Sequence, residues 1–279
     1  MQSVAILTTS WNNRDKILSV LESCFIQIEE MKNEDKFSFS VYLLDDESTD
    51  GTYDAVSEKF PTVRITRTDA KGEWHHGVRL IWDIAASDNP DFYLMIDPHI
   101  NLCDQALHTL LNNSKFLKDK AIIVGTIADA QGSSNLFGGM GKHGRLIEPD
   151  SILPVPCSLF DGLLVLIPKY VYQTIGNLDP AFKIKYADND YSVRARKNGI
   201  TIVTAPGILA HYDHKDSVPV WRNSAYPLKS RYKAMNSSDG CPPKERFLYE
   251  LRKCGLIGAI GNNISIWIKV LFPKRRTNK

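Results

Sequence analysis

Asp97 and His99, which flank Pro98 directly after the apolar run at 92–96, have the clearest potential for chemistry. In an extended chain, residues two apart point to the same side, so both side chains can reach one ion. A carboxylate oxygen and an imidazole nitrogen together suit Mn²⁺ and, to a lesser degree, Mg²⁺. The alternative is an Asp-Pro turn with an exposed histidine, because turns favour Asp and Pro. The triplet therefore indicates either a divalent-metal site or a simple turn.

A second acidic cluster, Asp45 and Asp46, follows the apolar run at 40–44 and precedes a helix that begins near Thr52. Capping explains Asp50 and Thr52, because helix N-termini favour Asp and Thr. Capping does not explain two adjacent acids directly after a buried strand. Their carboxylates could accept hydrogen bonds from the N3–H group of a pyrimidine and from a ribose hydroxyl. The pair is therefore a candidate nucleoside-binding site.

The first half of the chain alternates strand-like and helix-like segments, which predicts a mostly parallel sheet with right-handed crossovers. Ligands of such sheets collect beyond the carboxyl ends of the strands. Both acidic clusters fall at such ends, so we expect them on one rim. The expected strands cover 3–9, 40–44, 63–66, 92–96 and 121–125, and the expected helices begin near 12 and 52 and cover about 77–86 and 105–111.

The second half is less regular. A Gly- and Ser-rich segment at 132–144 predicts a hairpin or a mobile loop that closes over a ligand. A strand is expected at 162–167 and an acid-rich helix start within 185–199. A further strand starts at 200 and is expected to end near Pro206.

Bulk composition restricts the class of protein. A chain of 279 residues with 43% hydrophobic and 24% charged residues fits one large domain, or one domain with an appendage. The net charge of +2 is too small to suggest a nucleic-acid partner. The five scattered cysteines lack CxxC spacing and indicate reduced thiols of a cytoplasmic protein. No basic segment followed by an apolar one opens the chain, so a cleaved signal peptide is not expected.

The ordered series of motifs resembles the family 2 glycosyltransferases of the GT-A fold. Residues 4–14 and 44–52 resemble the opening of that family. Residues 72–77 and 93–99 resemble the stretch before and including its metal-binding DXD motif. Residues 161–168 and 187–199 resemble its acceptor-side strand and its catalytic acidic segment. The resemblance runs from about Val4 to His211, roughly three-quarters of the chain.

The resemblance implies an α/β fold of the GT-A (Rossmann-like) type, with a mostly parallel sheet flanked by helices over residues 1–220. Residues 221–279 then form a basic, amphipathic helical extension. A nucleotide sugar would contact Thr9, Asp45, Asp46, Trp74 and Asp97. A divalent ion, Mn²⁺ or Mg²⁺, would bind Asp97, His99 and His211, with His214 as the alternative to His211. His99 stands where the family's motif has its last acid, and a DXH variant is known among GT-A enzymes.

By the same resemblance Asp188 occupies the position of the general base. Asp188 and Asp190 diverge by about 200° on a helix, so only one of them can readily face a pocket. We expect Asp190 to cap the helix or to pair with Arg194 four residues later. An ordinary N-cap is the alternative for Asp188.

Trp74, His75 and His76 form a further group. Adjacent residues rarely aim at one ion, so a two-histidine metal site is not expected there. The histidines are expected in a partly exposed loop, with Trp74 either stacked on a sugar face or packed against the protein.

The resemblance implies an inverting glycosyltransferase that moves a hexosyl or deoxyhexosyl group from a UDP- or dTDP-sugar to a saccharide or lipid-linked saccharide. The Trp74 region and residues 188–191 look most similar to those of bacterial O-antigen and capsule transferases, some of which are rhamnosyltransferases. One alternative is a sugar-nucleotide-binding protein that has lost catalysis. A nucleotidyltransferase is another, but the segment after the first strand lacks the Gly-rich, Lys/Arg-bearing loop that such enzymes need.

The C-terminal tail is basic and apolar. Residues 242–279 hold nine Lys or Arg against Glu245 and Glu250, so the tail carries about +7. Two asparagines and Lys269 interrupt the apolar run at 256–272, and a spanning helix needs about 20 apolar residues. We expect an interfacial helix anchored by Trp267 and the basic residues at 274–276, or a helix packed on the domain. The first alternative predicts a cytoplasmic protein at the inner face of the plasma membrane.

Overall fold

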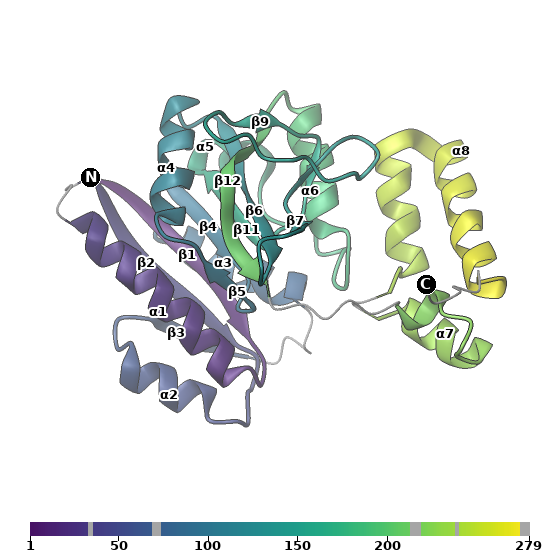
Figure 1. Cartoon of the computed structure of the whole chain (residues 1–279), viewed down its shortest axis with the longest axis horizontal. Helices are drawn as coiled ribbons and strands as arrows, with labels where there is room; N and C mark the ends of the chain where they lie inside the picture. The colour runs from purple at the N-terminus through teal and green to yellow at the C-terminus, as the bar shows by residue number, and fades with distance from the viewer. Residues whose placement is uncertain (33–35, 69–73, 213–218, 238–239, 274–279) are drawn as a thin grey trace.

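A computed structural model describes the chain except for residues 33–35, 69–73, 213–218, 238–239 and 274–279 (Figure 1). The protein is α/β, with a mixed, mostly parallel sheet between two layers of helices and a helical C-terminal extension. The strands are β1 Gln2–Ser10, β2 Phe37–Asp45, β3 Arg64–Arg67, β4 Phe92–Ile96, β5 Ile100–Leu102, β6 Ala121–Asp129, β7 Asn135–Phe137, β8 Gly139–Met140, β9 Val155–Pro156, β10 Leu159–Phe160, β11 Leu164–Pro168 and β12 Thr201–Tyr212. The helices are α1 Arg14–Met31, α2 Thr52–Lys59, α3 Trp74–Ala86, α4 Ala106–Phe116, α5 Lys169–Ile175, α6 Ala187–Lys197, the 3₁₀ turn η2 Val220–Arg222, α7 Leu228–Met235 and α8 Pro243–Leu271.

The main sheet has the strand order β3-β2-β1-β4-β11-β6-β12-β5. Strands β3, β2, β1 and β4 are mutually parallel, and β12 is parallel to β6. Strand β11 runs antiparallel to both β4 and β6, so its start meets the end of β4. The mostly parallel sheet expected from the alternation is therefore confirmed, with one antiparallel strand near its centre.

Alternating side chains of the buried strands supply two separate cores. Val4 and Ile6 of β1 face the layer of α1, α2 and α4, whereas Ala5 and Leu7 face α3, α5 and α6. Trp82 of α3 lies within 5.6 Å, between ring centroids, of Tyr93, Tyr172 and Tyr191 on three different elements. This aromatic cluster fixes α6 against α3 and the sheet.

Two expectations about the second half need correction or refinement. Strand β12 does not end near Pro206: it continues to Tyr212, with register shifts against β6 between Thr204 and Ala210. Gly207, at φ +72, supplies the left-handed residue that such an irregularity requires. The segment 132–144 holds β7, which pairs antiparallel with β6, so the hairpin alternative describes it.

The helix α8 folds back on itself. Gly255, at φ 77 and ψ −178, interrupts the helix and divides it into a first arm, residues 243–254, and a second arm, residues 256–271. The two arms lie side by side as a hairpin beyond α6 (Figure 1). By length and composition α8 as a whole could cross a membrane. Neither arm alone reaches the ~20 residues that a span needs.

The first arm is bonded to the loop before α6. The buried carboxylate of Glu245 accepts the backbone N–H groups of Lys183, Ile184 and Lys185 at 3.1, 3.1 and 2.8 Å. Tyr249 stacks on Tyr186 with ring centroids 5.4 Å apart. Met235, Tyr249, Ile266 and Val270 of the expected C-terminal extension thus belong to the core that α3 and α6 also line.

We expect Glu245→Ala to lower the free energy of unfolding by about 2–4 kcal/mol, because three partly or fully buried N–H groups lose a charged acceptor. Lys244→Ala, on the exposed neighbouring residue, is the matched control and should change it by less than about 0.5 kcal/mol. Urea unfolding of both variants measures the difference. Equal stabilities would contradict the anchoring role of Glu245.

Candidate functional site

The ends of several strands meet at one edge of the sheet. Ser10 pairs with Asp45 where β1 and β2 end, and Leu7 pairs with Met95 just before the end of β4. The backbone N–H of Asp97 donates to the carbonyl of Leu163 at 2.8 Å, directly before β11. The expected rim, with the two acidic clusters on it, is therefore present, and the segment 161–163 joins it.

Asp45 lies at this rim with its carboxylate fully enclosed. One oxygen accepts the backbone N–H of Ser48 at 3.2 Å, and the other lies 3.0 Å from Nε of Arg67. Asp46 and Thr9 are also buried there. The partners of Asp45 are thus protein groups in this structure, and nucleoside binding by Thr9, Asp45 and Asp46 stays a prediction.

Asp97 and His99 contact each other. Oδ1 of Asp97 accepts the backbone N–H of His99 at 2.8 Å and lies 2.9 Å from His99 Nδ1. A ring nitrogen that faces a carboxylate oxygen is the donor, so Nδ1 carries the proton and Nε2 keeps its lone pair when the ring is neutral. The turn alternative therefore describes the backbone, and metal binding by Asp97 and His99 stays a prediction.

His211 lies within strand β12 and does not join Asp97 and His99. Its Nδ1 donates to the carbonyl of Asp129 at 2.8 Å, and the neighbouring Tyr212 is the residue whose ring lies 6.3 Å from that of His99. Among the described residues, no three His, Cys, Asp or Glu side chains gather as a metal site. Metal binding by His211 stays a prediction, and His214 lies outside the described residues.

Asp188, in the first turn of α6, is the most precisely held acid of the rim. Its Oδ2 accepts the backbone N–H of Gly162 at 2.9 Å and lies 3.1 Å from Nε2 of His75. A Cβ on residue 162 would lie 2.5 Å from Oδ1 of Asp188, so only glycine permits this approach. Both contacts fall on Oδ2. Among the described residues Oδ1 has no hydrogen-bond partner, and it is the oxygen that can accept a proton.

His75 is a functional candidate that the sequence interpretation missed. It was expected in a partly exposed loop, but Trp74–His76 form the first turn of α3 and His75 is buried. Its spacing to Val78 and Trp82, three and seven residues later, puts His75 on the buried face of that helix. Extending the helical pattern backwards by three residues would have found it.

Both ring nitrogens of His75 face acceptors. Nδ1 lies 3.3 Å from the carbonyl of Ile184, and Nε2 faces the carboxylate of Asp188. Burial alone would lower the pKa of His75, but the charge and hydrogen bond of Asp188, the Ile184 carbonyl and the charge of Glu245 raise it above 6.5. The imidazolium form of His75 satisfies both contacts and then forms an ion pair with the half-buried carboxylate of Asp188.

Asp161 stands beside this pair. Loss of hydration on burial and the negative charge of Asp188 raise the pKa of Asp161 to about 7. The positive charges of Lys185 and His75 oppose this shift. A carboxyl group with a raised pKa therefore stands beside the carboxylate of Asp188, and perturbed groups of this kind cluster at functional sites.

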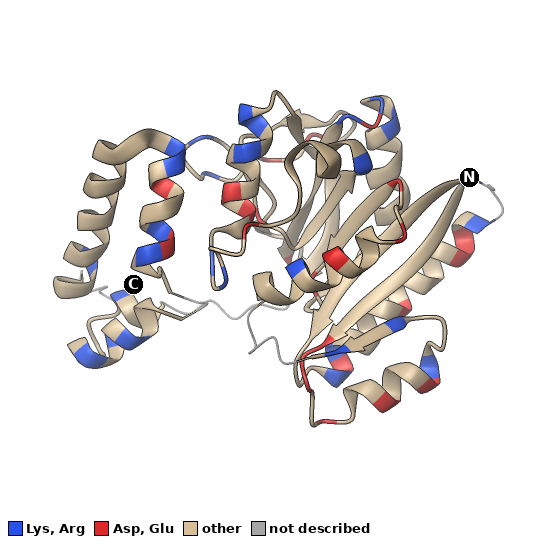
Figure 2. Ribbon diagram, turned by 180° about the vertical axis from the view of Figure 1, so that it is seen from behind, with Lys and Arg blue, Asp and Glu red and all other residues tan. Residues whose placement is uncertain are grey.

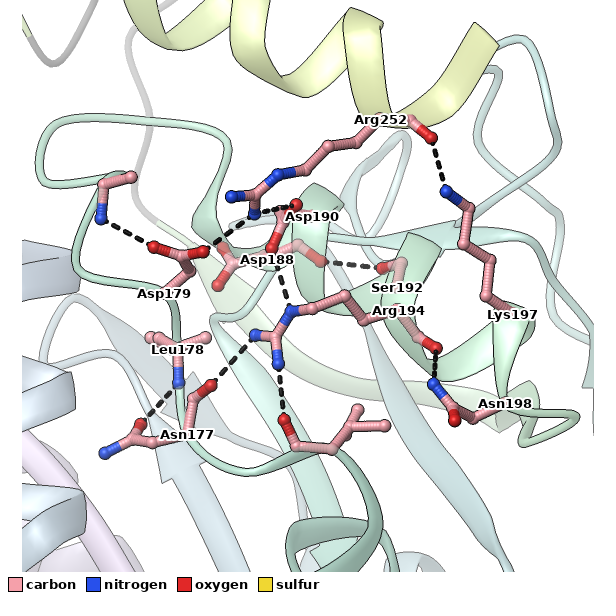
Figure 3. Close-up of polar contacts among 12 residues, drawn as sticks. Asn177, Leu178, Asp179, Asp188, Asp190, Ser192, Arg194, Lys197, Asn198 and Arg252 are labelled. Carbon is pink, nitrogen blue, oxygen red and sulfur yellow. Dashed lines mark hydrogen bonds and ion pairs between the residues drawn. The ribbon is translucent and has the colours of Figure 1, made fainter. Parts of the chain in front are cut away.

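Asp190 points away from the rim, as expected. It is fully buried and binds Nε of Arg194 at 2.9 Å and a terminal nitrogen of Arg252 at 2.8 Å (Figure 3). Arg194 also donates to the carbonyls of Ile175 and Asn177. The predicted pairing with Arg194 is confirmed, and Arg252 joins it from the first arm of α8.

Trp74 opens α3 and packs, half-buried, against the core beside α3. The packing alternative describes its contacts, and sugar stacking stays a prediction.

Comparison with models of known families and with curated proteins finds no match for this chain. The site must therefore be interpreted from its own geometry.

We expect His75 to titrate above 6.5 in an NMR titration of its ring signals, assigned with His75→Gln. In Asp188→Asn the midpoint should fall, because burial then opposes the charged ring without its partner. The stabilisation from this contact is complete below pH 6.5, the unfolded value, and is lost as the pH rises through the folded pKa.

Asp104→Asn, on an exposed acid, is the control for this titration and should leave the midpoint of His75 unchanged. A wild-type midpoint at or below 6.5, or one that Asp188→Asn does not move, would contradict the ion pair.

Proposed function

We propose that this protein is a glycosyltransferase of the GT-A type that transfers a sugar from a nucleotide diphosphate to a hydroxyl group of a saccharide. The observation that carries the proposal is the carboxylate of Asp188, which Gly162 and His75 hold by Oδ2 while Oδ1 has no hydrogen bond to a described residue. Asp97 lies near it, because its backbone bonds to Leu163, next to Gly162. A base and a candidate diphosphate site on one rim are what such a transfer needs.

The reaction proceeds as a single displacement. The acceptor hydroxyl attacks C1 of the donor sugar from the face opposite the diphosphate, so the anomeric configuration inverts. Oδ1 of Asp188 takes the hydroxyl proton, since Oδ2 is engaged by two donors. His75 touches neither substrate nor reacting atoms in this scheme and acts as a positioning residue for Asp188.

The donor occupies the ends of β1, β2 and β4. Thr9, Asp45 and Asp46 hold the nucleoside, and Trp74 lies on the sugar side. Mn²⁺ or Mg²⁺ would be held by Asp97 and His99 with diphosphate oxygens as further ligands, and would neutralise charge on the departing diphosphate. The donor is a UDP- or dTDP-linked hexose or deoxyhexose, and the product belongs to a bacterial surface polysaccharide.

Assays of binding and turnover distinguish two alternative functions from this one. A catalytically lapsed binding protein would bind the nucleotide sugar without turnover. The presence of His99 in place of the last acid of the family's DXD motif is the observation that favours this alternative. A nucleotidyltransferase would instead release pyrophosphate from a nucleoside triphosphate and a sugar phosphate.

We expect a thermal-shift screen to find a nucleotide sugar that raises the melting temperature, because a ligand that binds only the folded state stabilises it. With that donor, Asp188→Asn should reduce transfer by about 10³-fold or more while the melting shift remains, since loss of a general base slows the chemical step. The control is Asp104→Asn. Near-normal turnover of Asp188→Asn would remove Asp188 from the role of base.

We expect His99→Ala to weaken the dependence of donor affinity on Mn²⁺, because the ion loses one of its two nearby protein ligands. Titration of donor affinity against Mn²⁺ measures this, and His143→Ala, on an exposed loop histidine, is the matched control. The same Mn²⁺ dependence in His99→Ala and wild type would exclude His99 as a ligand.

A further inference from the structure

The second arm of α8 carries an exposed apolar stripe. Ile257 is 90% exposed, and about half of each of the other side chains of the stripe is exposed. The spacing of three or four residues puts them on one face of the helix. The stripe consists of Ile257, Ile260, Ile264, Ile268 and Leu271. Exposed apolar faces of this size mark surfaces that contact another molecule.

Contacts to the first arm and to α7 fix the second arm. Asn262 donates to the buried carboxylate of Glu250 at 2.8 Å, and Asn263 donates to the carbonyl of Pro243 at 3.0 Å. Trp267 stacks on Tyr232 of α7. These contacts hold the second arm in place, so the stripe is a fixed, exposed surface.

An open apolar groove lies between the arms. It encloses about 600 Å³ and is lined in part by Phe247, Ile260, Ile264 and Trp267. The groove adds apolar surface next to the stripe. Only 17% of the most apolar window of α8 is buried, so this helix is not a core helix of the protein.

The exposed charge of the described residues 219–273 has one sign. Both described acids of residues 219–273 are engaged internally: Glu245 by three backbone N–H groups, and Glu250 by Arg246 and Asn262. The exposed charged side chains of the same described segment are all basic, and Figure 2 shows Lys and Arg on α7 and α8. They are Arg222, Lys229, Lys233, Lys244, Lys253 and Lys269.

We infer that the second arm of α8 lies on an anionic phospholipid surface, with its isoleucine stripe in the acyl boundary and the exposed Lys and Arg of α7 and α8 near the headgroups. An exposed apolar stripe on a basic segment matches a negatively charged bilayer in both apolar character and charge. A second copy of the chain would instead bring two equally charged basic surfaces together. The second arm, residues 256–271, is shorter than the ~20 residues that a span needs.

If the proposed function holds, attachment to a membrane indicates the class of acceptor. The first arm binds the loop before α6 through Glu245 and binds α6 itself through Arg252 and Asp190. A membrane-bound hairpin therefore keeps Asp188, in the first turn of α6, within the same bonded unit as the lipid contact. A saccharide linked to a membrane lipid is the acceptor that such an arrangement serves.

The test is co-sedimentation of the full chain with vesicles of phosphatidylglycerol and phosphatidylcholine, and with vesicles of phosphatidylcholine alone. We expect binding to the anionic vesicles, weakened by salt, and at least about tenfold weaker binding of I257E/I264E. The matched control is F116E, which places the same charge on a 67% exposed side chain of α4. It should bind as the wild type does.

Equal binding by I257E/I264E and wild type would overturn the inference. So would a homodimer in solution that I257E/I264E converts to monomer, since the stripe would then be an interface between copies. Vesicle binding is measured without donor or acceptor, so it stands apart from the proposed function. Transfer to a soluble saccharide by a chain that ignores anionic vesicles would remove the lipid inference alone.

Discussion

The close approach of the Asp188 carboxylate to the backbone at residue 162 is the constraint on which the rest of the site depends. It ties the start of α6 to the segment that leads into β11, and His75 adds the start of α3 to the same carboxylate. Three elements that are far apart in sequence thus meet at one oxygen atom. A side chain at residue 162 would push these elements apart. Close packing alone therefore requires glycine at this position, whether or not the backbone turns there.

Much of the fold could be predicted from local patterns, because each buried strand of the first half is a short apolar run and each helix shows its periodicity. The position of both acidic clusters at one edge of the sheet followed from the predicted parallel topology alone. The antiparallel direction of β11 could not be predicted in this way. It depends on which strands become neighbours, and an apolar run such as 162–167 carries no information about direction.

The site was predicted in part, and the misses have a common cause. Asp190 was correctly separated from Asp188, because helical spacing decides that question within one element. His75, Glu245 and the environment of Asp161 depend on contacts between residues 60 or more apart or on the loop before β11, and no local pattern contains them. His211 was placed beyond a strand that in fact continues, because Pro206 and Gly207 suggested an end where the chain makes an irregularity.

The bond from Glu245 to residues 183–185 also has a consequence for the order in which the protein is made. During synthesis, His75, Asp161 and Asp188 leave the ribosome well before Glu245 does. Until then the loop that presents the Ile184 carbonyl to His75 lacks its charged acceptor. The sheet can form first, since its strands are complete by Tyr212, but the contacts between residues 183–185 and Glu245 form only when the last eighth of the chain is available. Maturation of the site is thereby delayed until the segment with the apolar stripe has itself been made.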